Sequence, residues 1–313
     1  MGAGHHHHGH SHHDHHGLHS HAHGPGHGRA FAVAIALNLL FVFVEAGFGL
    51  LSGSMALVAD AGHNLSDVLG LGIAWFADTL SRRPPTARFT YGFKSSSILA
   101  ALANASLLML AVGAISAESV RRLFMPEPVA GGTMMVVAAI GIVVNVATAL
   151  LFMRGSKDDL NIRGAFLHMV ADAAVSAGVV LAGLAIMMTG QEWIDPVASL
   201  AISAVIAWGT WGLLKDSLKL GLAGVPEGID EGDVRALLLS QTGVEAVHDL
   251  HIWPMSTTET ALTAHLLMPG GHPGDAFLHD MAELLLEKHG IGHVTVQVEA
   301  LDTGCVLMDE SVV

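Results

Sequence analysis

Six long runs of apolar residues constrain the fold of this chain more than any other feature. A helix needs about 20 mainly apolar residues to cross the hydrocarbon core of a bilayer, and every run is long enough. No signal-peptide cleavage pattern follows the first run, so we expect it to be retained as a helix. The sequence therefore predicts a membrane all-α domain, a bundle of six transmembrane helices. The expected helices cover residues 30–51, 56–80, 95–123, 133–153, 163–189 and 194–214.

The composition agrees with this prediction. Of the 313 residues, 51% are hydrophobic and only 13% are charged, whereas soluble domains carry about 25% charged residues. The single cysteine, Cys305, leaves neither a disulfide framework nor a cysteine-based zinc motif available. We interpret it as an ordinary free thiol in an integral membrane protein.

The second apolar run carries four polar side chains at helical spacing. Asp60, His63, Asn64 and Asp67 fall at positions i, i+3, i+4 and i+7. They therefore share one face of a helix. Ionisable groups in hydrocarbon are costly unless they pair, bind an ion or line a wet cavity, so this face is the first candidate functional site.

The fifth run repeats the pattern, because His168 and Asp172 are again separated by one helical turn. Together the two pairs offer two imidazole nitrogens and two carboxylate oxygens, a donor set that suits tetrahedral Zn²⁺. An interhelical hydrogen-bond network is the alternative, but two copies within membrane segments favour metal. The four candidate ligands are His63, Asp67, His168 and Asp172.

Further acidic residues lie in the apolar runs, and three of them can be interpreted from the sequence. Glu45 and Asp60 are candidates to support the metal ligands or to carry protons, because a carboxylate in lipid needs a specific reason. Asp195, followed by Pro196, is expected to be the N-cap of the sixth helix.

Residues 1–28 form an arm that contains 13 of the 22 histidines and almost no apolar residue. We expect this arm to be disordered. Clustered neutral imidazoles bind Zn²⁺, Co²⁺, Ni²⁺ and Cu²⁺ weakly, so the arm is expected to collect or buffer metal. The run from His5 to His8 could also belong to an expression tag, although the irregular spacing of the other histidines favours a native segment.

The chain changes character after residue 220. We divide it into a transmembrane domain (29–220), a hinge (221–228), a soluble domain (229–301) and a tail (302–313). Residues 227–313 include 15 acidic and 2 basic residues, a net charge of −13. This charge disfavours nucleic acid as a partner and favours divalent cations.

The soluble domain has the pattern helix 230–242, strands 246–253 and 259–268, helix 274–289 and strand 293–299. This αββαβ order predicts an α+β, ferredoxin-like domain. Its possible metal ligands are His248, Asp249, His251, His265, His293 and Glu299. The main candidates among them are His248, His265, His293 and Glu299. For each of them, the alternative is an exposed side chain on an acidic sheet.

Basic residues predict the orientation, because Lys and Arg concentrate in cytoplasmic loops. They gather between segments two and three, between four and five, and after six, which places both termini in the cytoplasm. Arg121 and Arg122 form the one contrary pair. The supporting residues are Arg82, Arg83, Arg88, Lys94, Arg154, Lys157, Arg163, Lys215 and Lys219.

Six motifs are distributed over both domains. They are ADAGHNLSD (59–67), YGFK (91–94), LHMVAD (167–172), DP (195–196), HDLHIW (248–253) and HVTVQVE (293–299). With these motifs, the chain over residues 29–301 resembles the zinc-type branch of the cation diffusion facilitator family. The resemblance implies a homodimer in the bacterial inner (plasma) membrane, with a cytoplasmic C-terminal domain, that exports divalent metal in exchange for protons. It also implies that the paired His and Asp residues form the transport site and that the C-terminal candidates lie in regions with cytoplasmic metal sites.

Two departures from the family pattern stand out. Members often have Arg and Glu shortly after the Tyr-Gly motif, where this chain has Ser95, Ser96 and Ser97. The loop 81–91 also lacks His, Asp and Glu, so an additional metal site found there in some relatives is not expected.

The ligand types suggest how exchange would work. Metal binds only the neutral imidazole, so protons and Zn²⁺ compete at histidines whose unperturbed pKa is about 6.5. We expect Zn²⁺ as the transported and also the regulatory ion, with Co²⁺, Ni²⁺ and Cd²⁺ as alternatives. An intramembrane zinc hydrolase would need a His-Glu-x-x-His motif, which the sequence lacks. A metal sensor or store would explain the arm and the acidic domain, but not ligands buried in the membrane.

Overall fold

The computed structural model describes residues 28–153 and 160–300. The histidine-rich arm, Arg154, Lys157, Cys305 and the C-terminal tail lie outside these residues. The chain forms two compact units. The first unit comprises Met1–Val68 and Ala114–Ser203, and the second comprises Leu69–Gly113 and Ala204–Val313.

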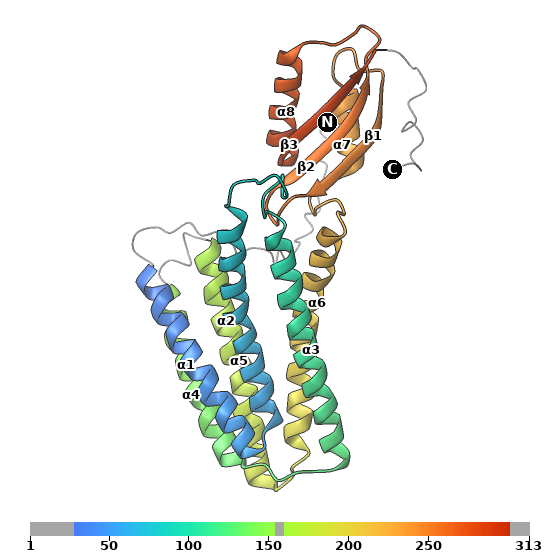
Figure 1. Cartoon of the computed structure of the whole chain (residues 1–313). Helices are drawn as coiled ribbons and strands as arrows, with labels where there is room; N and C mark the ends of the chain where they lie inside the picture. Colours follow the sequence, from blue (N-terminus) through green and yellow to red (C-terminus); the bar gives the residue numbers. More distant parts are fainter. Residues whose placement is uncertain (1–27, 154–159, 301–313) are drawn as a thin grey trace, which may run out of the picture. The chain divides into compact units, whose positions relative to one another are not determined.

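Within the described residues, six long helices occupy the predicted membrane segments (Figure 1). The sixth helix continues past residue 214, because the segment that follows is rich in Lys and Leu, which are good helix formers. The helices are α1 (Gly28–Ser52), α2 (Met55–Ser81), α3 (Ser96–Phe124), α4 (Gly131–Met153), α5 (Leu160–Thr189) and α6 (Ile194–Gly221).

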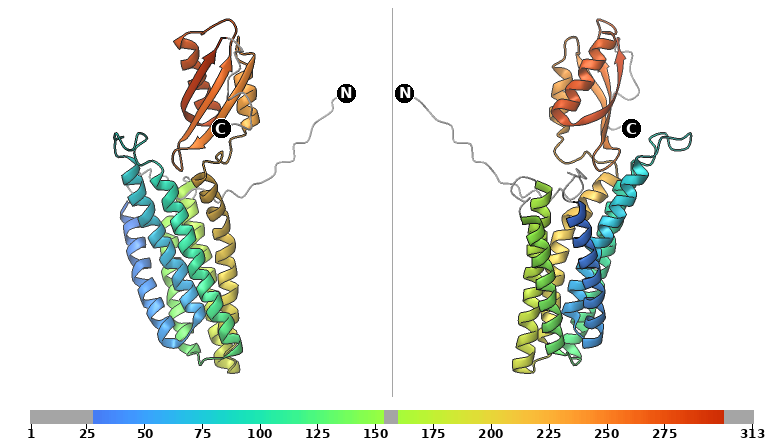
Figure 2. Two further views of the ribbon diagram at one scale, coloured as in Figure 1. Left: turned by 45° about the vertical axis from the view of Figure 1, so that its right-hand side comes forward. Right: turned by 90° about the vertical axis from the view of Figure 1, so that its left-hand side faces the viewer.

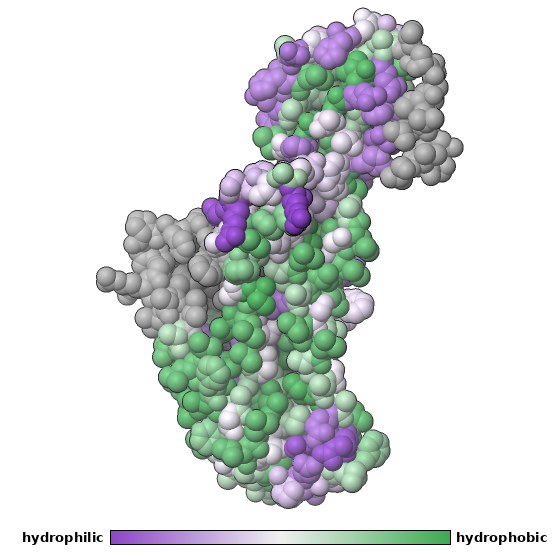
Figure 3. Space-filling model, viewed as in Figure 1, coloured by the Kyte–Doolittle hydropathy of each residue, from purple (hydrophilic) through white to green (hydrophobic). Residues whose placement is uncertain are grey.

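The helices present an apolar surface. Within the described residues, α3, α4, α5 and α6 are long and apolar enough to cross a membrane, and α1 adds the shorter apolar stretch Ala36–Ser52. Large apolar side chains are exposed on them, including Trp208 at 89% and Leu51 at 84%, and green dominates the helices in Figure 3. Such a surface is stable against lipid rather than water, which confirms an integral membrane protein.

In the first unit, α4 packs against α5 and α1. The closest approach is at Gly131 of α4 and Gly183 of α5. A Cβ atom on Gly131 would lie 3.0 Å from the Gly183 carbonyl oxygen, and one on Gly183 would lie 2.9 Å from the Gly131 carbonyl oxygen. Small residues let membrane helices approach closely, so both positions require glycine.

Asp195 corrects one prediction. Because α6 begins at Ile194, Asp195 lies inside its first turn and is not its N-cap. Its buried carboxylate instead accepts hydrogen bonds from the start of α2, from Ser54 Oγ (2.6 Å), Met55 N (2.7 Å) and Ala56 N (3.2 Å). An anion there satisfies free backbone N–H groups and the positive end of the helix dipole.

Arg121 and Arg122, the pair that opposes the charge asymmetry, are held in ion pairs at the end of α3. Glu118 Oε1 lies 2.6 Å from Arg121 Nη2 and 3.0 Å from Arg122 Nε. Glu127 also pairs with both arginines, and Arg122 donates a hydrogen bond to the Gly53 carbonyl oxygen. The two arginines therefore join the end of α3 to the α1–α2 loop at Gly53 and to the α3–α4 loop at Glu127.

The C-terminal domain confirms the predicted αββαβ order. The strands form a sheet in the order β1-β2-β3, with β1 antiparallel and β3 parallel to β2. α7 and α8 pack on one face of the sheet (Figure 2), around Leu238, Leu262 and Leu285. Alternate side chains point to opposite faces of a strand, so His265 and Glu299 lie on the other face. The elements are α7 (Glu231–Leu239), β1 (Ala246–Pro254), β2 (Thr260–Leu267), α8 (Asp275–His289) and β3 (Ile291–Glu299).

Helix α6 ends in a hydrogen-bonded turn at the start of the predicted hinge. Gly224 N donates to the Lys219 carbonyl oxygen (2.9 Å) and Ala223 N donates to the Leu220 carbonyl oxygen (3.1 Å). Ala223 has a φ of 58°. This is a Schellman motif with alanine in the left-handed position that usually holds glycine.

The segment between α2 and α3 contacts the C-terminal domain within the second unit. Lys94 Nζ lies 2.6 Å from Glu259 Oε1. The serines that replace the family's Arg and Glu make neutral contacts beside this ion pair. These are Ser95 Oγ to the Met255 carbonyl oxygen (3.2 Å) and Thr257 N to Ser97 Oγ (3.1 Å).

Candidate metal centres

Helices α2 and α5 bring the four predicted intramembrane ligands together. His63 Nε2 lies 3.6 Å from Asp67 Oδ2 and 3.5 Å from Asp172 Oδ1. His168 Nε2 lies 3.1 Å from Asp67 Oδ2 and 3.6 Å from Asp172 Oδ2. Each imidazole therefore faces both carboxylates, one on its own helix and one on the neighbouring helix.

Three of the four residues meet the spacing of a metal centre, because single ligand atoms of His63, Asp67 and Asp172 lie within 4.8 Å of one another. His168 Nε2 approaches the two carboxylates but stands outside that three-residue group. Zinc bonds of about 2.0–2.1 Å place ligand atoms about 3.3 Å apart at the corners of a tetrahedron. The nitrogen–oxygen separations above cluster around this value. Asp172 is nearly buried, with 4% of its side chain exposed, whereas 20% of His63 and 32% of Asp67 are exposed.

A purely hydrogen-bonded network would leave these residues poorly satisfied. Among the described residues, Asp67 Oδ2 is buried and has no hydrogen-bond partner, although it is the oxygen nearest to His168. His63 Nδ1 is also buried without a partner there, but it is Nε2 of this ring that approaches the carboxylates. Buried polar atoms are normally paired. The missing hydrogen bond at Asp67 Oδ2 favours a cation that would bind this oxygen together with the nitrogens that approach it.

Glu45 and Asp60, the predicted supporting carboxylates, lie behind this cluster on α1 and α2 and are fully buried. Asn64 Nδ2 donates to Glu45 Oε2 (3.2 Å) and Ser176 Oγ donates to Asp60 Oδ2 (3.0 Å). Asn64 follows His63 on α2, and Ser176 lies one turn beyond Asp172 on α5. Each carboxylate is therefore hydrogen-bonded to a neutral side chain that lies close in sequence to a candidate metal ligand.

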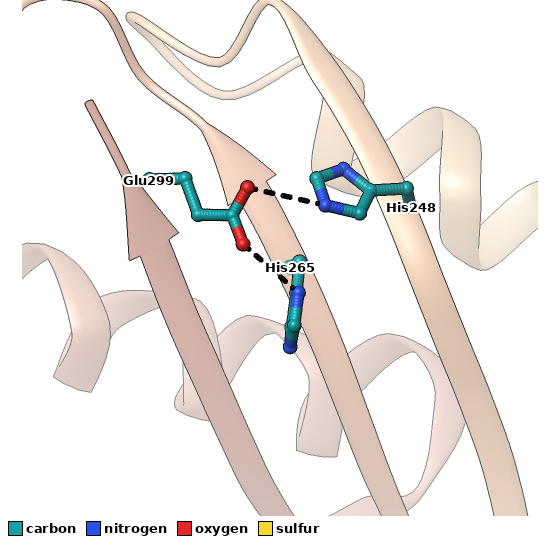
Figure 4. Close-up of side chains that lie close together, drawn as sticks. All are labelled: His248, His265 and Glu299. Carbon is teal, nitrogen blue, oxygen red and sulfur yellow. Dashed lines mark ion pairs between the residues drawn. The ribbon is translucent and has the colours of Figure 1, made fainter. Parts of the chain in front are cut away.

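A second cluster lies on the open face of the C-terminal sheet (Figure 4). His248 Nε2 is 3.2 Å from Glu299 Oε2, and His265 Nδ1 is 3.1 Å from Glu299 Oε1. His248 and His265 are paired across β1 and β2, and Glu299 ends β3. His248 Nε2 is buried without a hydrogen bond of normal geometry, so one donor on each of the three strands is directed at a common point.

Asp249, which the sequence indicated only as one of several possible ligands, lies beside this second cluster and orients it. Its Oδ2 lies 3.4 Å from His265 Nε2 and its Oδ1 lies 2.8 Å from His251 Nε2. Asp249 adopts a φ of 50° where the register of β1 shifts between His248 and His251. A carboxylate on the far nitrogen of a histidine fixes the ring and leaves the other nitrogen for metal.

His293, the remaining C-terminal candidate, does not join this cluster. It lies near the start of β3, six positions before Glu299, and is exposed. Its ring makes an edge contact with Tyr91, with centroids 5.6 Å apart. The structure thus groups three of the four predicted C-terminal ligands and places the fourth against the α2–α3 segment.

The prediction for the second cluster concerns metal stoichiometry. In the full-length protein, His248→Ala removes one of three converging donors, so we expect one zinc ion fewer per chain in equilibrium dialysis with metal analysis. Asp249→Asn should still bind the zinc ion, but with an affinity lower by about 10–100-fold, as expected for loss of an orienting carboxylate. His279→Ala, at a histidine whose side chain is 73% exposed, is the matched control. An unchanged metal count in His248→Ala would contradict the site.

Sequence comparisons agree with this architecture. Residues 31–220 match the cation efflux transmembrane domain, and residues 226–301 match the cytoplasmic domain of cation efflux proteins. The chain is 37% identical over 258 residues to the zinc transporter ZitB of Escherichia coli, covering 82% of each protein. It is 36% identical over 261 residues to the cadmium, cobalt and zinc/H(+)-K(+) antiporter of Bacillus subtilis, covering 82% of this chain and 84% of that protein.

Two further proteins are similar. The metal cation efflux system protein CzcD of Cupriavidus metallidurans is 35% identical over 252 residues, covering 80% of each chain. The solved metal-bound C-terminal domain of the CzcD transporter from that organism is 33% identical, with a TM-score of 0.22, and covers 23% of this chain and 99% of that domain.

Membrane-spanning helices with converging imidazoles and carboxylates, joined to an acidic C-terminal domain, define a membrane transporter of metal cations rather than an enzyme. The chain belongs to the cation efflux family, also called the cation diffusion facilitator family.

Proposed function

We propose that this protein exports divalent metal cations, Zn²⁺ foremost, from the cytoplasm in exchange for protons. The transport site would consist of His63, Asp67, His168 and Asp172. The observation that carries the proposal is the convergence of these two imidazoles and two carboxylates from two membrane helices. The names of the relatives, which include zinc transport and proton-coupled antiport, support it.

Proton exchange follows from the chemistry of the ligands. An imidazole binds metal only when it is neutral, so metal ions and protons compete for His63 and His168, and metal that binds a protonated site releases its protons. A site open to a neutral cytoplasm would load metal. The same site, open to a more acidic exterior, would bind protons and release the metal.

We further propose that the protein works in the bacterial inner membrane with both termini in the cytoplasm. The charge asymmetry of the loops supports this orientation. The arm at residues 1–28, with its 13 histidines, would then raise the local metal concentration at the cytoplasmic entrance.

The C-terminal domain matches a cytoplasmic dimerisation domain, and we propose a homodimer regulated by metal. Residues 227–313 carry a net charge of −13, so two copies repel each other when metal-free. Zinc at His248, His265 and Glu299 would lower that repulsion and draw the copies together.

Vesicle flux distinguishes the proposed exporter from a sensor or store. The protein is placed in sealed proteoliposomes that contain a zinc indicator and have a lumen more acidic than the medium. Zinc added outside should then enter the lumen, and protons should leave the lumen as zinc enters. Adding Co²⁺, Ni²⁺ or Cd²⁺ as competitors then ranks the cations. Stoichiometric binding of zinc without any flux would establish a store instead of an exporter.

A further inference from the structure

Glu45 and Asp60 form a buried acidic pair that the four-ligand metal centre does not use. Both residues are 0% exposed. Each has one neutral donor, Asn64 for Glu45 and Ser176 for Asp60. Among the described residues, neither carboxyl forms an ion pair with Lys, Arg or His.

The pair lacks hydrogen bonds as well as countercharge. Within the part of the chain that the structure describes, Glu45 Oε1 and Asp60 Oδ1 are buried with no hydrogen-bond partner, yet the two carboxyl groups are placed to interact with each other. Two carboxylates cannot donate to each other. Two buried negative charges without countercharge would also cost several kcal/mol each in this environment.

We propose that Glu45 and Asp60 bind one proton between them, forming a proton site distinct from the His and Asp ligands. One carboxyl then donates to the other, which supplies the missing hydrogen bond and removes one of the two charges. Carboxyl pairs that share a proton for this reason are a recurrent arrangement in proteins. The inference deepens the proposed function, because it assigns part of the proton exchange to residues outside the metal ligands.

The site is placed to respond to metal. His63 on α2 and Asp172 on α5 are the charged groups that act on the pair electrostatically, while Asn64 and Ser176 are neutral. A divalent cation bound at the ligand cluster adds positive charge next to the pair and favours its deprotonated form. Metal loading therefore expels the shared proton to the solvent, and metal release allows it to return.

Infrared difference spectroscopy on the full-length protein in nanodiscs tests the proton directly. Addition of zinc should remove a protonated-carboxyl C=O band that shifts in D₂O. The Glu45→Gln variant should lack this band and should release about one proton fewer per zinc ion, measured with a pH indicator in weak buffer. Ser176→Ala keeps both carboxyls and should shift the band without abolishing it. Glu127→Gln, a partly exposed acid at the end of α3, is the matched control and should match the wild type.

The outcomes separate this inference from the transport proposal. A wild type without the band, or a Glu45→Gln variant with unchanged band and proton count, would overturn the proton site. Loss of the band on adding K⁺ at constant pH would also overturn it, because the pair would then hold a metal cation in place of the proton. The band is measured without vesicles, so it stands or fails independently of zinc flux.

Discussion

Replacing His63 or Asp172 by alanine should abolish zinc transport while the protein still folds and inserts. Each change removes one of four converging donor atoms. Losing only an orienting neighbour of a metal ligand already weakens binding by about 10–100-fold, so losing a ligand should cost more. The measurement is zinc flux into proteoliposomes, with circular dichroism and size-exclusion chromatography to confirm folding.

Two further variants sharpen this test. His63→Asp keeps four donors but exchanges a nitrogen for an oxygen and adds charge, so transport should persist with altered preference between Zn²⁺ and Cd²⁺. His279→Ala, at an exposed histidine of α8, should transport normally. Normal zinc flux in His63→Ala or Asp172→Ala would remove these residues from the transport site.

Replacing Asp195 by alanine is expected to cause the largest loss of stability. The change leaves three donors at the start of α2 without an acceptor in a fully buried position. Loss of a helix cap typically costs about 0.5–2 kcal/mol, and each buried hydrogen bond to a charged group contributes about 1.5–3 kcal/mol. We expect a destabilisation of at least about 3 kcal/mol, measured as the free energy of unfolding in detergent.

Asp195→Asn should be milder, because the amide oxygen still accepts hydrogen bonds although the charge is lost. Asp275→Ala is the matched control, since Asp275 is also an acid in the first turn of a helix but is exposed. If Asp195→Ala and Asp275→Ala unfold alike, the cap does not stabilise α2.

The sequence predicted the features that depend on local spacing. Apolar length located the six helices, and the separation of His63 from Asp67 by one turn placed both ligands on one face. The strand predicted at residues 293–299 is present, and its alternate residues Val294, Val296 and Val298 pack against the core. These periodicities are set by backbone geometry and need no knowledge of tertiary contacts.

Features that depend on distant contacts were not predictable in the same way. Asp195 precedes a proline at a helix start, which locally indicates a cap for α6, but the helix that it caps begins 140 residues earlier. Strand register decides that His248 meets His265 and Glu299 while His293 does not. The positive φ of Asp249, which turns its carboxylate toward His265, also arises from the shift in that register.

The hydrogen bonds between Asp195 and the start of α2 also limit how α2 can move. Fixing one end of a helix converts motion into rotation about that end, so displacement grows with distance from the pivot. At about 1.5 Å of rise per residue, His63 lies about 12 Å from Met55, whereas the far end of α2 at Ser81 lies about 39 Å away. A tilt of about 10° would therefore shift His63 by about 2 Å but Ser81 by about 7 Å. Such a tilt would displace the proposed ligand His63 far enough to release an ion, while the far end of the same helix would move several times as far.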